Sequence, residues 1–322
     1  MLMVITLAFL SLMHDYESVY KLALRAIKAI VLMVFTYSFF EVFFLNELSS
    51  LMFTFYRMED KSNIDGVAVS FFTLPYYAAY ILNTFLVFLL SNYKINKSFV
   101  SALYVLICII SVIFTQSKMG IALTFSIFFL FYFMRSKFIS KTLICFLFFV
   151  FVVILYTYLY DVVSFMYSKY GGNLFSTLYV MLKSPEQSGN LMERVNDIHS
   201  TYELIITNNI FVGVGLGKGV TIETWIASLM YRYGFIGLAL FIITYISMGL
   251  YSWRLYSIEN NIYRAELLNI CSIWALTIFI SQLSGLMMEI SKNAVVTCFM
   301  FALTSFVMAK NNNKNLVKEG GV

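Results

Sequence analysis

Residues 225–253 read WIASLMYRYGFIGLALFIITYISMGLYSW, and this stretch decides the fold class of the chain. Arg232 is its single charged side chain. An α-helix needs roughly 20 mostly apolar residues to cross about 30 Å of hydrocarbon. Backbone polar groups in lipid must be paired within the protein, which leaves helices or a closed barrel. Because this apolar run is continuous and does not alternate, it predicts a transmembrane helix.

The rest of the chain has the same character. It is 61% hydrophobic and 12% charged, with two prolines, whereas soluble domains carry roughly 25% charged residues. We therefore expect an all-α, polytopic membrane bundle of about nine transmembrane helices, forming one domain over residues 1–322. The expected spans are 1–13, 27–45, 67–90, 99–115, 119–134, 142–160, 225–253, 267–288 and 294–309. The first is short, and because it lacks a basic start and a cleavage site we expect no removed signal peptide.

The loops predict the orientation, because Lys and Arg collect in short cytoplasmic loops. One side is richer in them, although the other side carries the longest polar insert, residues 161–224. We expect that insert, and a shorter one at residues 46–66, to face outwards and the C-terminus to be cytoplasmic. The expected cytoplasmic cations are Lys21, Arg25, Lys28, Lys94, Lys97, Arg135, Lys137, Lys141, Arg254, Arg264, Lys310, Lys314 and Lys318.

The net charge of +5 reflects this topology and does not indicate nucleic-acid binding. The four cysteines all lie in expected spans, and the sequence has neither a Cys-x-x-Cys pair nor clustered histidines. We expect no disulfide framework, no metal site and no other cofactor.

Two segments have amphipathic periodicity. In residues 193–208, apolar side chains recur at steps of three and four, as in one stripe of a helix. Such a helix can lie on the bilayer surface or cap the bundle. Its stripe comprises Val195, Ile198, Tyr202, Ile205 and Ile206. Residues 15–28 form a second amphipathic segment, which suits the cytoplasmic headgroup layer.

Two external cations are candidates for anion binding. Lys118 lies in the turn Ser117-Lys118-Met119-Gly120 between two spans, where a lysine that snorkels to the interface is the alternative. Arg194 stands near the start of the expected helix 193–208, where a cation opposes the helix dipole and adds no helix stability. It is either a solvated arginine or a clamp for pyrophosphate, which guanidinium binds in a bidentate way.

The end of the external insert contains alternating glycines. Their backbone N–H groups could approach an anion, with Lys218 adding charge; a flexible loop is the alternative. The glycines are Gly213, Gly215, Gly217 and Gly219. His199 and Asp197 are each either surface residues or acid–base candidates.

Glu223 and Arg232 flank the next span. Nine residues on a straight helix turn through about 900°, which puts the two on opposite faces. Both can line one cavity only if the helix breaks between them or starts after Glu223, and Gly234 and Gly237 are the expected flexible points. Acids near lipid are functional candidates by default, and Glu41 and Glu289 are two of them. For Glu41 the alternative is a structural role in the bundle.

These residues occur in an order that resembles the O-antigen polymerase and ligase superfamily. Ser117-Lys118-Met119-Gly120 matches a "Ser-Arg-x-Gly" turn, and Arg194 matches an arginine in the large external loop. The sequence NNIFVGVGLG at 208–217 resembles "Pro-hydrophobic-x-Gly-x-Gly", and ETWIASLMYRYGFIG at 223–237 matches the length and glycines of the next motif. The resemblance covers about residues 66–251.

The chain departs from the family pattern in four places. Lys118 replaces an arginine, Asn209 replaces the proline, and Glu223-Thr224 replaces the His-Asn of the ligase branch. Compared with most members of the family, the chain is also short and lacks several N-terminal helices. It would then be either a compact member or a chain whose start is incomplete. The third departure favours the polymerase branch.

The resemblance implies a metal-independent glycosyl transfer on the outer face of the bacterial inner membrane. The donor would be an oligosaccharide on undecaprenyl pyrophosphate, and the acceptor a sugar hydroxyl of a second lipid-linked unit. The product would be O-antigen, in lipopolysaccharide biosynthesis, or capsule. Lys118, Arg194 and Arg232 would hold pyrophosphate, with Lys218 and Arg57 as further substrate contacts. Glu223 would be the general base, with His199 as second choice. Expected partners are the lipid-linked oligosaccharide, membrane lipid and a chain-length regulator protein.

Three other functions compete. An O-antigen ligase would be expected to carry histidine at position 223. A flippase of lipid-linked sugars would place charges near mid-membrane and show internal repeats, whereas here they concentrate in one external insert. An assembly or chain-length partner would usually have few spans.

Overall fold

The computed structural model describes residues 15–44, 47, 67–72, 74–171, 173–184, 189–207, 209–215, 222, 224–285 and 291–309, and these contain helices and no strand. The elements, in chain order, are α2 (Tyr16–Phe43), the 3-10 turn η2 (Ser70–Phe72), α4 (Pro75–Asn96), α5 (Phe99–Phe114), α6 (Lys118–Arg135), α7 (Phe138–Tyr170), α8 (Asn173–Lys183), α9 (Gly189–Thr207), α10 (Trp225–Ile258), α11 (Ile262–Ser281), the 3-10 turn η4 (Gln282–Ser284) and α12 (Ser291–Ala309).

The all-helical membrane class is confirmed. Within the described residues, six helices are long and apolar enough to cross a bilayer: α2, α4, α6, α10, α11 and α12. The two halves of α7 meet at a bend of 54°, and counting them as one span gives seven. The expected span 99–115 is the shorter apolar helix α5. The first expected span, residues 1–13, lies outside the described residues.

Several expected boundaries were wrong. The span expected at 142–160 belongs to α7, which continues to Tyr170 within the expected insert, and the span expected at 267–288 is α11, which begins at Ile262 and ends at Ser281. The amphipathic segment 15–28 and the span 27–45 form one continuous helix, α2, whose N-cap is Asp15. The span expected at 67–90 begins only at Pro75, because residues 67–72 form an extended segment and the turn η2. Glu41 holds this segment: its Oε2 accepts hydrogen bonds from the N–H groups of Val69 (3.1 Å) and Ser70 (2.7 Å). Of the two alternatives for Glu41, these contacts support the structural role.

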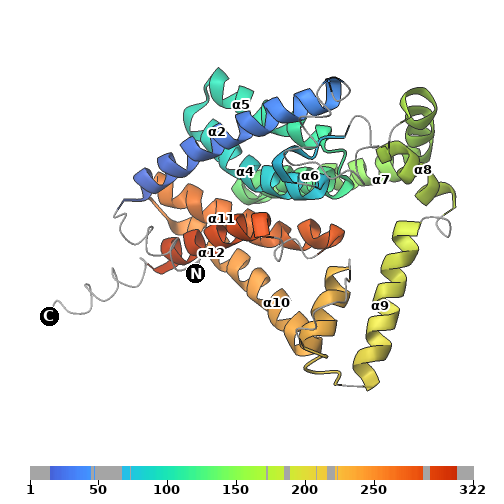
Figure 1. Cartoon of the computed structure of the whole chain (residues 1–322). Helices are drawn as coiled ribbons and strands as arrows, with labels where there is room; N and C mark the ends of the chain where they lie inside the picture. The colour runs from blue at the N-terminus through green and yellow to red at the C-terminus, as the bar shows by residue number, and fades with distance from the viewer. Residues whose placement is uncertain are drawn as a thin grey trace.

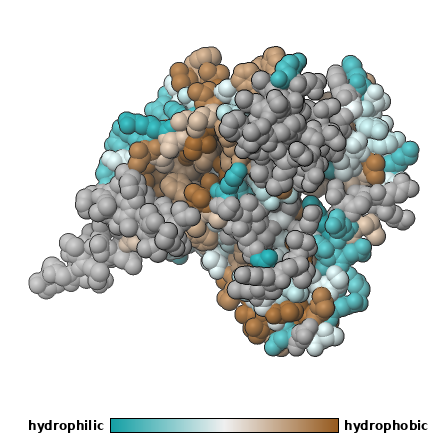
Figure 2. Space-filling view, in the orientation of Figure 1, coloured by the Kyte–Doolittle hydropathy of each residue, from teal (hydrophilic) through white to brown (hydrophobic). Residues whose placement is uncertain are grey.

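The helices α4 and α11 form the centre of the bundle and are the most deeply buried of the candidate spans. In Figure 1, α2 and α5 lie on one side of this pair, while α10 and α12 lie on the other. The outer helices expose many apolar side chains, as expected where lipid is the solvent. Figure 2 shows this apolar surface in brown over the upper helices and near the lower end of α10.

A buried ionic cluster joins one end of α4, α6 and α11. The carboxylate of Glu266 is ion-paired with Arg135 and with Lys94, at 3.2 Å for the lysine, and it accepts a hydrogen bond from Ser91. The Arg135 guanidinium also stacks over the Phe131 ring at 3.8 Å. From the sequence, Lys94 and Arg135 were only loop cations. Glu266 was not singled out at all.

This cluster gives a stability prediction. Glu266→Ala should lower the free energy of unfolding by about 3–5 kcal/mol, because removal of one partner leaves buried charge uncompensated. The matched control is Glu17→Ala, whose partner Lys21 lies on the exposed surface of α2. Thermal unfolding in detergent should show a large loss of Tm for the first variant and none for the second. Equal Tm values for the two variants would contradict this role of Glu266.

Candidate functional site

The turn Ser117-Lys118-Met119-Gly120 begins α6, and its serine and glycine fix its position. Ser117 is the N-cap, and its Oγ accepts a hydrogen bond from the Gly120 N–H at 3.1 Å. A Cβ on Gly120 would lie 2.6 Å from the Cβ of Ala79, so the glycine allows α4 and α6 to approach closely. Asn83 of α4 donates to the Gly120 carbonyl at 3.0 Å. Lys118 is thereby fixed, half-buried, in the first turn of α6.

Arg194 lies in α9, but not where we expected it. The helix begins at Gly189 instead of residue 193, so Arg194 lies beyond the first turn and the helix-dipole argument does not apply. Its Nη1 donates to the carbonyl of Leu283, just after α11, at 2.6 Å. Its Nε is buried and, among the described residues, has no hydrogen-bond acceptor.

Lys118 and Arg194 come from distant parts of the sequence, and the fold brings them within electrostatic range of each other. The guanidinium is near enough to the ammonium for their positive charges to oppose each other. In the described part of the chain, neither has a carboxylate within ion-pair distance. Two half-buried like charges destabilise each other. An anion between them would remove that cost, and the N–H groups at the start of α6 favour the same charge.

The start of α10 contacts the same part of α9. Thr224 Oγ1 lies 3.5 Å from the Arg194 carbonyl and 3.4 Å from Asp197 Oδ2. Glu223 lies outside the described residues, and its chain neighbour Thr224 lies beside Arg194. Among the described residues, Asp197 is the one whose carboxylate contacts the start of α10.

The flexible point expected at Gly234 is confirmed, since its φ of 63° and ψ of −165° are not helical. The helix itself starts at Trp225, after Glu223. Gly213 packs against Gly234: a Cβ on Gly213 would lie 2.6 Å from the Gly234 nitrogen. Val214 N–H donates to the Tyr231 carbonyl at 2.7 Å and fixes the contact. Figure 1 shows the short first part of α10 turned back against the long second part. This close backbone contact accounts for Gly213 and Gly234, while Gly237 lies in a regular helical stretch.

The other predicted residues are spread more widely. His199 is exposed and lies 3.4 Å from Glu203 Oε1; five residues along α9 place it about 140° from Arg194. Arg232 is half-buried just before the break. Arg57, Lys218 and Glu289 lie outside the described residues.

The amphipathic stripe of α9 is largely uncovered. Val195, Ile198, Tyr202 and Ile206 are exposed, whereas Ile205 and Thr201 are buried. Since α9 packs on α10 through its other face, the stripe is available to the bilayer surface.

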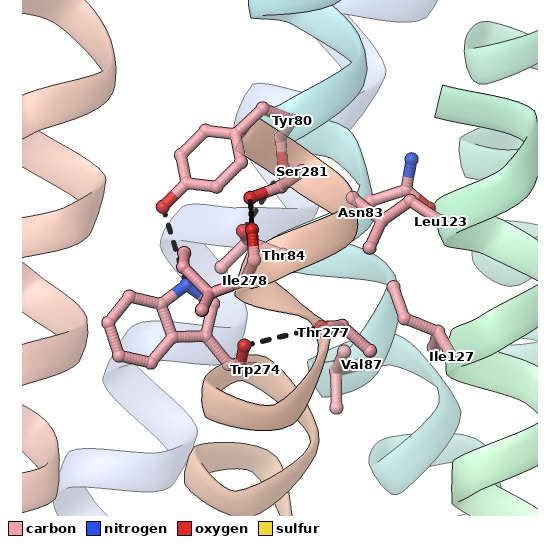
Figure 3. Close-up of a pocket in the computed structure, with 10 residues that line it drawn as sticks. All are labelled: Tyr80, Asn83, Thr84, Val87, Leu123, Ile127, Trp274, Thr277, Ile278 and Ser281. Carbon is pink, nitrogen blue, oxygen red and sulfur yellow. Dashed lines mark hydrogen bonds between the residues drawn. The ribbon is translucent and has the colours of Figure 1, made fainter. Parts of the chain in front are cut away.

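The bundle core beneath this site is tightly packed. Figure 3 shows a cavity lined by Tyr80, Asn83, Thr84, Val87, Leu123, Ile127, Trp274, Thr277, Ile278 and Ser281. Its volume is ≈ 10 Å³, which is space for about one water molecule. Tyr80 accepts from Trp274 Nε1 at 3.4 Å and bonds Thr297 at 2.9 Å, so helices α4, α11 and α12 are linked here. A sugar cannot enter this cavity.

Sequence reasoning missed Asn83 and the Leu283 carbonyl. Asn83 had a usable signal, because it is an amide within the apolar run ILNTFLVFLL at residues 81–90. The Leu283 carbonyl had none, since any residue can supply a backbone oxygen.

No protein-family model, curated protein or solved structure matches this chain. Its function must therefore be inferred from its own residues and their geometry.

Proposed function

We propose that the protein is a polysaccharide polymerase that joins oligosaccharide units carried on undecaprenyl pyrophosphate, at the outer face of the bacterial inner membrane. The observation that carries this proposal is the half-buried pair Lys118 and Arg194. Pyrophosphate is the ligand that such a pair favours, since a charge-assisted contact to each cation offsets their repulsion. The sequence motifs around both cations resemble those of the polymerase and ligase superfamily.

The proposed reaction is a displacement at the anomeric carbon of the donor sugar. The acceptor hydroxyl oxygen forms a bond to that carbon while the bond to the pyrophosphate oxygen breaks. The electron pair leaves with undecaprenyl pyrophosphate, and the hydroxyl proton passes to the Glu223 carboxylate and then to water. Lys118 and Arg194 stabilise the negative charge that develops on the leaving group. Asp197 and Thr224, beside Arg194, position the start of α10 for this step.

Two alternatives are less well supported. A ligase would share the cation pair, but the chain has Glu223-Thr224 where that branch has His-Asn. A flippase needs a passage for sugar, and the cavity between α4, α6 and α11 has space for about one water molecule.

Deleting the gene in its native host separates the three functions. Loss of a polymerase should leave surface glycans with a single repeat unit, visible as collapse of the ladder on a gel. Loss of a ligase would leave long glycans on undecaprenyl pyrophosphate, and loss of a flippase would trap single units on the cytoplasmic side. Either of these last two outcomes would overturn the proposal. Complementation with Glu223→Gln, which should keep the single-unit pattern, then tests the proposed base.

A further inference from the structure

A groove lined mainly by aromatic side chains lies between α6 and α7. Its volume is ≈ 410 Å³, and it opens outwards on the apolar surface of the bundle. The lining residues are Phe125, Phe128, Phe129, Tyr132, Ile144, Leu147, Phe148 and Phe151. Ring pairs close its sides, with centroids 4.5 Å apart for Phe129–Phe148 and 5.8 Å for Phe125–Phe151. The groove is thus a hollow in a surface that elsewhere faces lipid.

The groove lies on the same face of α6 as Lys118. Phe125, Phe129 and Tyr132 follow Lys118 by 7, 11 and 14 residues, which places all four within about 40° of one line along the helix. Ala122 lies on the same line, is exposed, and leaves space with its small side chain. At 1.5 Å per residue, Phe125 lies about 10 Å below Lys118.

We propose that this groove binds the polyprenyl chain of the lipid whose pyrophosphate lies at Lys118 and Arg194; this rests on the proposed function. The choice of lipid follows from the line of residues. In a polyprenyl pyrophosphate the hydrocarbon begins directly at the phosphate, so it can contact Ala122 and Phe125 at once. In a glycerophospholipid, a glycerol and two polar ester groups would occupy that apolar stretch. A single chain with methyl branches and flat double bonds also suits one groove with ring faces on both sides.

The test measures binding and does not depend on sugar transfer. Purified protein in detergent is irradiated with a photoreactive polyprenyl pyrophosphate, and labelled peptides are mapped. Leu147→Trp fills the groove and should reduce labelling of α6 and α7 about tenfold, equivalent to about 1.4 kcal/mol. The matched control is Phe146→Trp, one position earlier on α7, where the side chain is 61% exposed and does not line the groove. It should label like the wild type.

Competition distinguishes the lipid classes. Unlabelled undecaprenyl pyrophosphate should suppress labelling, whereas phosphatidylglycerol at the same concentration should not. Equal labelling of both tryptophan variants, or equal suppression by both lipids, would overturn the groove assignment. If Leu147→Trp does not give a monodisperse protein, Ile144→Trp replaces it. If the wild-type protein lengthens glycans but Leu147→Trp is labelled like the wild type, this inference alone is overturned. If labelling follows the expected pattern but the wild-type protein does not lengthen glycans, the proposed function alone is overturned.

Discussion

Arg194→Ala is expected to lower the rate of glycan extension about 100- to 1000-fold, the usual effect of removing one group that stabilises transition-state charge. Arg194 lies within electrostatic range of Lys118, and its buried Nε has no acceptor among the described residues. The measurement is single-turnover extension of lipid-linked units by purified protein. Because the lost contact strengthens as the leaving group gains charge, kcat should fall more than KM rises.

Lys183→Ala is the matched control for loss of a positive charge. Lys183 ends α8, is exposed, and contacts the Tyr179 ring instead of the cation pair. It should retain the wild-type rate. Lys118→Arg should also remain active, since arginine keeps the positive charge and can bind phosphate oxygens. An Arg194→Ala protein that extends glycans at the rate of Lys183→Ala would remove Arg194 from the site.

Gly234→Ala is expected to disrupt the break in α10 and lower stability by at least about 3 kcal/mol. Its φ and ψ belong to a region that is essentially restricted to glycine, where other residues cost about 1–3 kcal/mol. In addition, an added Cβ would lie 2.3 Å from the Phe211 carbonyl oxygen. Gly213→Ala should behave similarly, because its Cβ would meet the backbone of Gly234 and Tyr231.

Gly215→Ala is the control for these glycine variants. Gly215 also has positive φ, at 100°, but a Cβ there would meet no atom within 4 Å. It should show backbone strain without a clash, and hence the smallest loss of Tm of the three. The same loss in all three variants would show that the contact between Gly213 and Gly234 does not hold the break.

Much of the fold could be predicted from the sequence because lipid restricts the choices so strongly. Long apolar runs gave the positions of α5, α6 and α12 to within a few residues. The start of α4 was placed too early for a specific reason: residues 67–72 are apolar like a span, yet they bind the distant Glu41 carboxylate. Hydrophobicity alone cannot show such a contact.

The site was partly predictable for similar reasons. Gly234 was predicted as a flexible point because it is a glycine in the span, and the break was found there, although it follows Arg232 instead of lying between Glu223 and Arg232. The position of Arg194 relative to Lys118 depends on how α9 packs on α10 and on its contact with Leu283, which no local pattern encodes. The early start of α9 was missed because residues 189–192 lack the periodicity of the rest of the helix. Glu266 was missed because its partners, Lys94 and Arg135, are far away in sequence.

The most direct test of the proposed function is extension by the purified protein alone. Proteoliposomes containing the protein and only lipid-linked repeat units from the native host are incubated, and the glycan length and released undecaprenyl pyrophosphate are measured. We predict glycans of several units, with one undecaprenyl pyrophosphate released for each new linkage. Units that remain single while they move across the bilayer would contradict the account.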